Sequence, residues 1–155
     1  MRVLLASASE RRFAWLNDCF QSIDITCIPL ISKEKNIEKN KSVKQQSKDI
    51  CFSKAESAAL EWSLVDSETH DIPDVIIVSD TLVESPGNEN MALGKPEDSF
   101  MSTSMLLRLS GKRHRVWSST AILVQKNKQY QSLYSDWRYK IWTDYAIVEF
   151  DDLSE

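Results

Sequence analysis

The sequence predicts one α/β domain built on a mixed, twisted sheet with flanking helices. Strand-like and helix-like patterns alternate over residues 1–110, which is typical of interleaved strands and helices. A continuous β-branched run at residues 74–79 is typical of a strand that is covered on both faces. Residues 113–150 alternate and are rich in Val, Ile, Trp and Tyr, as paired long strands are. No repeat or linker divides the 155 residues, so we expect a single domain over residues 1–155.

Composition and charge exclude several classes of protein. An apolar content of 42% with 27% charged residues is ordinary for a globular chain, and a net charge of −4 provides no basic field for nucleic acid. No apolar run approaches the ~20 residues of a membrane helix, and residues 1–6 are too short a run for a signal peptide. We therefore expect a cytoplasmic protein that binds neither nucleic acid nor membrane. Cys19, Cys27 and Cys51 form no CxxC pair and are expected to be buried free thiols.

The first elements follow from short local patterns. Residues 2–6 form an apolar run that predicts a strand, and residues 10–20 have apolar positions at helical spacing. Residues 23–30 alternate well enough for a second strand. Residues 33–41 are nearly all charged or amide, which predicts a solvated loop, with a loop facing substrate as the alternative.

Residues 43–64 predict a longer helix with an apolar stripe. Lys54 belongs near that stripe, because it lies three residues after Cys51 and four before Ala58. Its ammonium group must therefore either reach out to solvent or meet an anion.

The second half continues from the buried strand at residues 74–79, which we expect to end at Asp80. Turn-forming residues at 85–90 predict a hairpin loop. Residues 95–109 resemble a helix with Pro near its start and Ser-Gly after its end. Two or three long strands complete the chain over residues 113–150.

The turn after the first strand could bind an anion. Ser7, Ser9 and Arg12 lie where a strand leads into a helix, and a helix N-terminus attracts negative charge. The two serines also have an ordinary explanation, because either one can cap the helix. Both interpretations stay open at this stage.

Asp80 and Lys95 are two further candidates. Asp80 directly follows the buried strand, at the edge where open α/β sheets bind ligands, and its carboxylate could hold Mg²⁺ or orient water. Lys95 lies on a turn that leads into a helix and could meet a phosphate. An ordinary turn aspartate and an ordinary surface lysine are the alternatives.

Taken in order, these fragments resemble the Maf family of nucleoside triphosphate pyrophosphatases, which is related in fold to the inosine triphosphate pyrophosphatases. The family opens with Leu-Ala-Ser-x-Ser-Pro-Arg-Arg, and its later motifs follow in the same order as here. The matching segments are LASASERR at residues 5–12, Lys54-Ala55, Asp80-Thr81-Leu82-Val83, LGKP at 93–96 and LSGKRHRV at 109–116.

The resemblance implies hydrolysis of a nucleoside triphosphate to the monophosphate and pyrophosphate, with Mg²⁺ or Mn²⁺ as cofactor. Asp80 would be the catalytic residue, as metal ligand or as the base for water. The substrate would be dTTP or UTP, or a modified nucleotide, and the usual homodimer of the family is expected by analogy. The substrate-binding residues implied by the resemblance are Ser7, Ser9, Arg12, Lys54, Lys95 and Glu34.

The chain departs from the family pattern in several places. Glu10 replaces the family's proline, and Glu34 is the nearest counterpart of its usual acidic pair. Family members also continue into a further helix and a Gly-Tyr-x-Ile-Gln-Gly segment, so we expect a Maf-like domain shortened at its C-terminus. Apolar surface around Trp137, Trp142 and Tyr145 is then expected to be exposed. The alternative function is a catalytically impaired nucleotide-binding or interaction protein.

Overall fold

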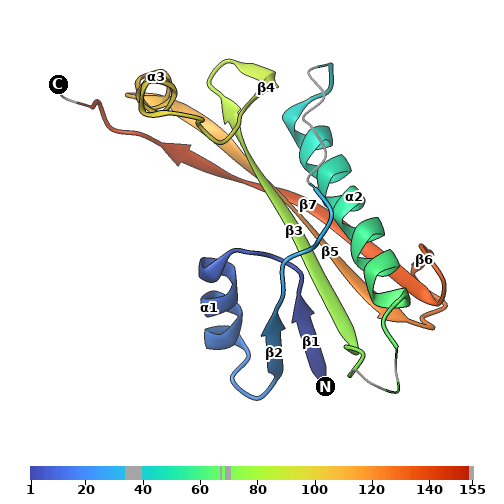
Figure 1. Cartoon of the computed structure of the whole chain (residues 1–155). Helices are drawn as coiled ribbons and strands as arrows, with labels where there is room; N and C mark the ends of the chain where they lie inside the picture. Colours follow the sequence, from blue (N-terminus) through green and yellow to red (C-terminus); the bar gives the residue numbers. More distant parts are fainter. Residues whose placement is uncertain (34–39, 67, 69–70, 154–155) are drawn as a thin grey trace.

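The computed structural model describes residues 1–33, 40–66, 68 and 71–153. Within these residues a seven-stranded sheet has the order β2-β1-β3-β5-β7-β6, with β4 paired to the end of β3 (Figure 1). The predicted α/β class with a mixed sheet and flanking helices is confirmed. The strands are β1 (Arg2–Leu5), β2 (Asp24–Cys27), β3 (Val75–Ser85), β4 (Asn88–Leu93), β5 (Arg113–Gln125), β6 (Gln131–Ser132) and β7 (Trp137–Glu149), and the helices are α1 (Glu10–Cys19), α2 (Val43–Ser63) and α3 (Ser99–Leu109).

The sheet changes direction at β3. β1 pairs in parallel with β2 and with β3, whereas β3, β5 and β7 form a long antiparallel meander. The parallel strands β1 and β2 are joined through α1, as a crossover connection requires, whereas the antiparallel strands β5 and β7 are joined by a short segment that contains β6. As predicted, β5 and β7 are long strands, and Lys126 at φ 58° begins the turn after β5.

α2 covers one face of the meander with small side chains. Cys51, Ala55 and Ala58 are fully buried and pack in one core cluster with Ile76 of β3. Small residues on the helix allow close approach to the sheet, so the predicted apolar stripe of this helix is confirmed.

Trp137 belongs to the same core and is 1% exposed, so its predicted exposure was wrong. It is the first residue of β7 and packs in the cluster that α2 covers. Trp142 and Tyr145 lie further along β7 and are exposed, as predicted.

β3 is longer than the sequence indicated. The predicted strand end at Asp80 was wrong, because β5 pairs with β3 continuously from Val75 to Val83 and keeps it extended. Asp80 therefore lies in the middle of β3. The predicted hairpin loop is confirmed as the tight turn between β3 and β4, where Gly87 has φ 75°.

The cysteines differ in exposure. Cys51 is buried and Cys27 is half-buried, but Cys19 is exposed at the last position of α1, so the predicted burial of all three was wrong. No helix of the described residues is long and apolar enough to cross a membrane.

Candidate active site

The candidate site lies in a gap along one edge of β3. β1 pairs with β3 only as far as Ile77, and β4 begins to pair with the same edge at Val83. Between these points, over residues 78–82, no described strand pairs with this edge. Main-chain groups of Ser79 and Thr81 therefore face the gap, because alternate residues of a strand point their N–H and C=O groups to the same edge.

Two cationic side chains reach this gap from different helices. Arg12 of α1 donates from Nη1 to the Ser79 carbonyl at 3.4 Å and from Nη2 to Thr81 Oγ1 at 3.0 Å. Lys54 of α2 donates from Nζ to the same carbonyl, also at 3.4 Å. The Ser79 carbonyl thus brings together two candidates that lie 42 residues apart in the chain, at positions 12 and 54.

Lys54 also forms a buried ion pair with Asp80. Nζ lies 2.9 Å from Asp80 Oδ1, and the two side chains are 16% and 9% exposed. This answers the question that the helical stripe left open, because the ammonium group meets an anion. Asp80 Oδ2 is buried and has no hydrogen-bond partner among the described residues. A buried acceptor without a partner is uncommon, and it marks the point where a cation or a proton donor would be stabilised.

Ser7 and Ser9 shape the turn that leads into α1. Ser9 caps the helix by accepting the Arg12 N–H at 3.4 Å, and Ser7 Oγ accepts the Ser9 N–H at 3.1 Å. The Cys27 thiol donates to the Ser7 carbonyl at 3.0 Å. The structure therefore shows that Ser9 caps α1 and that Ser7 holds Ser9 in place, and Arg12 of this first turn reaches the gap.

The remaining candidates are Lys95 and Glu34. Lys95 is exposed on the segment between β4 and α3, and the interactions described above that join Arg12, Lys54 and Asp80 do not include it. Glu34 lies outside the described residues. Among the residues that the structure does describe, no three His, Cys, Asp or Glu side chains form a group that would hold a metal by themselves.

The sequence did not predict a group of hydroxyls next to Asp80, which belong to Ser47, Ser119 and Thr143. Ser47 Oγ lies 3.0 Å from Ser119 Oγ and 3.5 Å from the Asp80 carbonyl, and its single proton can be donated to one of these two acceptors at a time. Ser119 is hydrogen-bonded in turn to Thr143 Oγ1 at 2.8 Å. Ser47 had a detectable signal, because it precedes Cys51 by four residues on the buried stripe. Ser119 had none, since its position beside Asp80 depends on the register between β3 and β5.

Cys51 lies beside the ion pair but is not a reactive nucleophile. Burial and, to a smaller extent, the negative charge of Asp80 raise the pKa of the Cys51 thiol to about 12, while the charge of Lys54 lowers it. The thiolate is the nucleophilic form of cysteine, so Cys51 stays protonated and inert at neutral pH.

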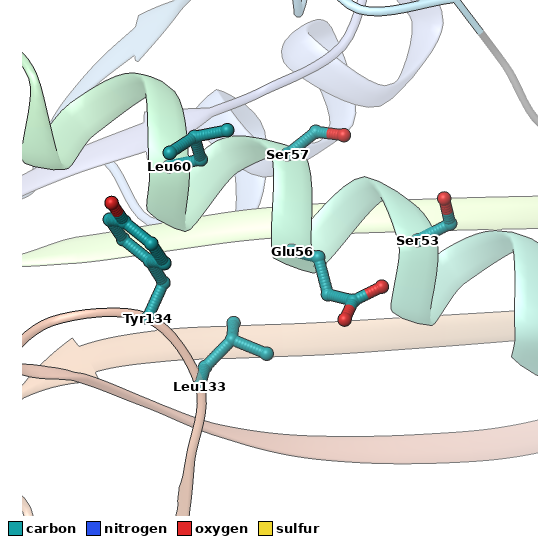
Figure 2. Close-up of a pocket in the computed structure, with 6 residues that line it drawn as sticks. All are labelled: Ser53, Glu56, Ser57, Leu60, Leu133 and Tyr134. Atoms are coloured by element: carbon teal, nitrogen blue, oxygen red, sulfur yellow. The ribbon is translucent and has the colours of Figure 1, made fainter.

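A separate pocket of about 270 Å³ lies between α2 and the segment that follows β6 (Figure 2). Half of its lining is polar, and none of the lining residues is a predicted site residue. The lining residues are Ser53, Glu56, Ser57, Leu60, Leu133 and Tyr134. The chemistry expected from the sequence therefore gathers at the β3 gap and not in this pocket.

Comparison with known proteins gives consistent results. A family model described as "Maf-like protein" matches residues 2–155. A dTTP/UTP pyrophosphatase of Clostridium beijerinckii is 30% identical over 154 residues, which are 97% of this chain and 74% of that protein. A second dTTP/UTP pyrophosphatase, from Clostridium novyi, is 33% identical over 128 residues, which are 82% of this chain and 60% of that protein.

A human relative and a solved structure are also similar to this chain. A human protein named "probable bifunctional dTTP/UTP pyrophosphatase/methyltransferase protein" is 31% identical over 99% of this chain, which spans 23% of its length. The solved structure of the Staphylococcus aureus Ham1 protein aligns with a TM-score of 0.52 at 14% identity, covering 96% of this chain and 71% of that one. At this identity the structural match supports the fold alone.

Proposed function

Because this chain belongs to the Maf-like family, we propose that it hydrolyses a nucleoside triphosphate between the α and β phosphates and releases pyrophosphate. The predicted family is confirmed by the match over residues 2–155. The residues that perform the reaction are proposed from the geometry at the β3 gap.

The observation that carries this proposal is the buried ion pair of Lys54 and Asp80 beside the Ser79 carbonyl. The Asp80 carboxylate pairs with Lys54 and has a second oxygen without a described partner, and Arg12 contacts the same Ser79 carbonyl as Lys54. A triphosphate needs cations to neutralise its charge, and phosphoryl transfer depends mainly on charge stabilisation and positioning. The arrangement supplies both requirements at one point of the sheet.

In the proposed reaction each side chain has a separate task. Arg12 and Lys54 exchange their contacts with the Ser79 carbonyl, each 3.4 Å long, for shorter and stronger contacts with phosphate oxygens. Asp80 accepts the proton of the attacking water or serves as a metal ligand. Ser7 and Ser9 present the N-terminus of α1 to the phosphates. Lys95 and Glu34 are proposed to bind substrate on the strength of the resemblance alone.

The residues at the gap fit a divalent cation. Mg²⁺ in nucleotide enzymes is commonly held by one or two carboxylates together with substrate phosphates and water. Asp80 Oδ2, buried and without a described partner, provides such a carboxylate oxygen. When bound there, Mg²⁺ or Mn²⁺ would neutralise phosphate charge and favour ionisation of the attacking water.

Pyrimidine nucleotides are the proposed substrates. The curated relatives described above are named for dTTP and UTP. Arg11-Arg12 together with Asp80-Thr81 also resembles the pyrimidine-cleaving branch of the family. A homodimer and a cytoplasmic location without nucleic-acid binding are proposed by analogy with the family.

The test is pyrophosphate release by the 155-residue chain with dTTP, UTP and a methylated guanine nucleotide, each with Mg²⁺ and with a chelator. We expect metal-dependent release that is fastest with the pyrimidines. Faster cleavage of the methylated guanine nucleotide would contradict the proposed substrate. Binding of triphosphate by calorimetry with no release from any nucleotide would instead support the alternative of a catalytically impaired nucleotide-binding protein.

A further inference from the structure

A line of hydroxyl groups crosses the sheet directly beside Asp80. Asp80 of β3 is in register with Ser119 of β5, and Ser119 is in register with Thr143 of β7. Side chains in register on neighbouring strands point to the same face, and here that face is the one that α2 covers. Ser47 of α2 completes the line at 3.0 Å from Ser119 and 3.5 Å from the Asp80 carbonyl.

Core packing alone does not explain these hydroxyls. Ser47 and Ser119 are both fully buried, and the neighbours of Ser119 on the same face, Trp117 and Ala121, are apolar. A buried hydroxyl is unfavourable unless it is hydrogen-bonded, and an apolar side chain of similar size avoids that requirement. All three hydroxyls of the line are satisfied by one another.

The line lies where β3 is least supported. On its other edge, residues 78–82 have no described strand partner, so the Asp80 main chain is held by β5 on one side only. A hydroxyl contact from α2 to the Asp80 carbonyl adds a second restraint at this position. Catalysis depends on such restraints, since a misplacement of 1 Å at a reacting group can lower the rate about 10²-fold.

We propose that Ser119 is a positioning residue for Asp80, acting through Ser47 in a buried hydroxyl chain that extends to Thr143. This role rests on the proposed function in one respect, namely that Asp80 takes part in triphosphate hydrolysis. Ser119 itself does not touch substrate. When Ser119 donates to Ser47 Oγ, the single Ser47 proton is available for the Asp80 carbonyl, and this contact fixes the main chain that carries the carboxylate.

The kinetic test compares Ser119→Ala with Ser119→Thr. We expect Ser119→Ala to lower kcat about tenfold while KM changes less than about twofold, because the substrate contacts are intact. Ser119→Thr retains a hydroxyl and should recover most of kcat. Ser63→Ala is the matched control, because Ser63 lies on the same helix as Ser47 and its hydroxyl donates to the local Ala59 carbonyl, one turn earlier in the helix. Wild-type kcat in Ser119→Ala would overturn the proposal.

A second measurement does not depend on turnover. Thr143→Val replaces the hydroxyl with a methyl group of similar size, and Thr143 lies two strands away from Asp80. The carbon resonance of the Asp80 carboxylate should shift in this variant and stay in place in Ser63→Ala. An unmoved Asp80 resonance in Thr143→Val would contradict the hydroxyl chain. Failure of the wild-type protein to cleave any triphosphate would contradict the proposed function. The Asp80 carboxylate resonance in Thr143→Val would still show whether the hydroxyl chain positions Asp80.

Discussion

Asp80 is the residue on which the proposed chemistry depends most directly. Asp80→Asn keeps the shape of the side chain and one oxygen near Lys54, but it removes the negative charge. We expect turnover to fall to the buffer rate, and the free energy of unfolding to fall by about 1–3 kcal/mol because Lys54 keeps a hydrogen bond but loses its counter-charge. Pyrophosphate release and urea denaturation measure the two effects. Substantial Mg²⁺-dependent activity in the variant would remove Asp80 from the mechanism.

Arg12 offers a test with a matched neighbour. Its guanidinium bonds Ser79 and Thr81 at the gap, whereas the preceding Arg11 is exposed and is not part of this cluster. Arg12→Ala should weaken triphosphate binding by about 1.5–3 kcal/mol, as the loss of a hydrogen bond to a charged group does. Arg11→Ala should change binding by less than about 0.5 kcal/mol. Calorimetric titration of both variants with triphosphate measures the two changes in binding free energy. Equal losses of affinity would mean that the net positive charge near the gap matters, and not the specific contacts of Arg12.

At the scale of single residues, the sequence predicts side-chain chemistry better than main-chain chemistry. The spacing of Lys54 on its helix indicated that its ammonium group would either reach solvent or meet an anion, and the structure shows the second outcome, with Asp80 as the anion. The Ser79 carbonyl had no such signal, because every residue has a carbonyl group and only the end of β1 exposes this one. Ser119 was missed for a related reason, since strand register is a property of two distant segments.

Among the elements, the end of α3 depends on a glycine. Gly111 has φ 62°, and a Cβ at this position would collide with the Asp152 carboxylate, which the chain brings back beside the helix end. The Asp152 carboxylate is the end of an exposed side chain and turns aside at little cost, so Gly111→Ala should destabilise the fold by about 1–3 kcal/mol through backbone strain alone. Gly87→Ala is the control, because Gly87 has φ 75° and open space around it. Thermal unfolding should show similar losses in the two variants, and a clearly larger loss at Gly111 would show that Asp152 does not turn aside.

The burial of α2 predicts the behaviour of its cysteine. With a pKa of about 12, Cys51 has a thiolate fraction on the order of 10⁻⁴ at pH 8. Alkylation of the native protein should modify the exposed Cys19 first and leave Cys51 unmodified until the protein unfolds. Mass spectrometry of peptides identifies the site. Early modification of Cys51 would show that α2 opens readily.

The same thiol makes stability depend on pH in the alkaline range. The unfolded thiol ionises near the ordinary value of 9.0, whereas the folded thiol keeps its proton up to about pH 12. The contribution of the protonated Cys51 thiol to the free energy of unfolding is therefore complete below pH 9, and it is lost as the pH rises from 9 to 12. Cys51→Ala should flatten this part of the stability profile. An unchanged slope in that variant would assign the alkaline loss to other groups.

Element types were predictable where a pattern repeats over many residues, as in α2 and β5. The end of β3 was not, because Asp80 has a low strand preference and it is the long partner strand β5 that keeps this part of the chain extended. The burial of Trp137 could not be predicted from the sequence either. Its environment is set by α2, which precedes it in the chain by more than seventy residues.

For the whole molecule, ligand binding should appear as stabilisation. A ligand that binds only the folded state at 100 times its Kd adds about 2.7 kcal/mol to the free energy of unfolding. We expect dTTP with Mg²⁺ to raise the melting temperature, and dTTP with a chelator to raise it less. Asp80→Asn should lose the difference between the two conditions. A metal-independent shift would show that the triphosphate is bound by Arg12 and Lys54 without a cation at Asp80.

The pairing of β1 with β3, which connects the β1–α1–β2 unit to the rest of the sheet, affects the order in which the parts of the protein fold. Arg2 bonds Asp74 across 72 positions of the chain, whereas β5 and β7 are joined by a short connection. Contacts between distant segments form late, because closing a long loop costs entropy before any contact compensates for it. The β5–β7 hairpin should therefore form early and the β1–α1–β2 unit should join last. In the native protein the same unit should open first, so that hydrogen exchange at β1 is faster than at β5, and each opening carries Arg12 away while Lys54 and Asp80 remain paired.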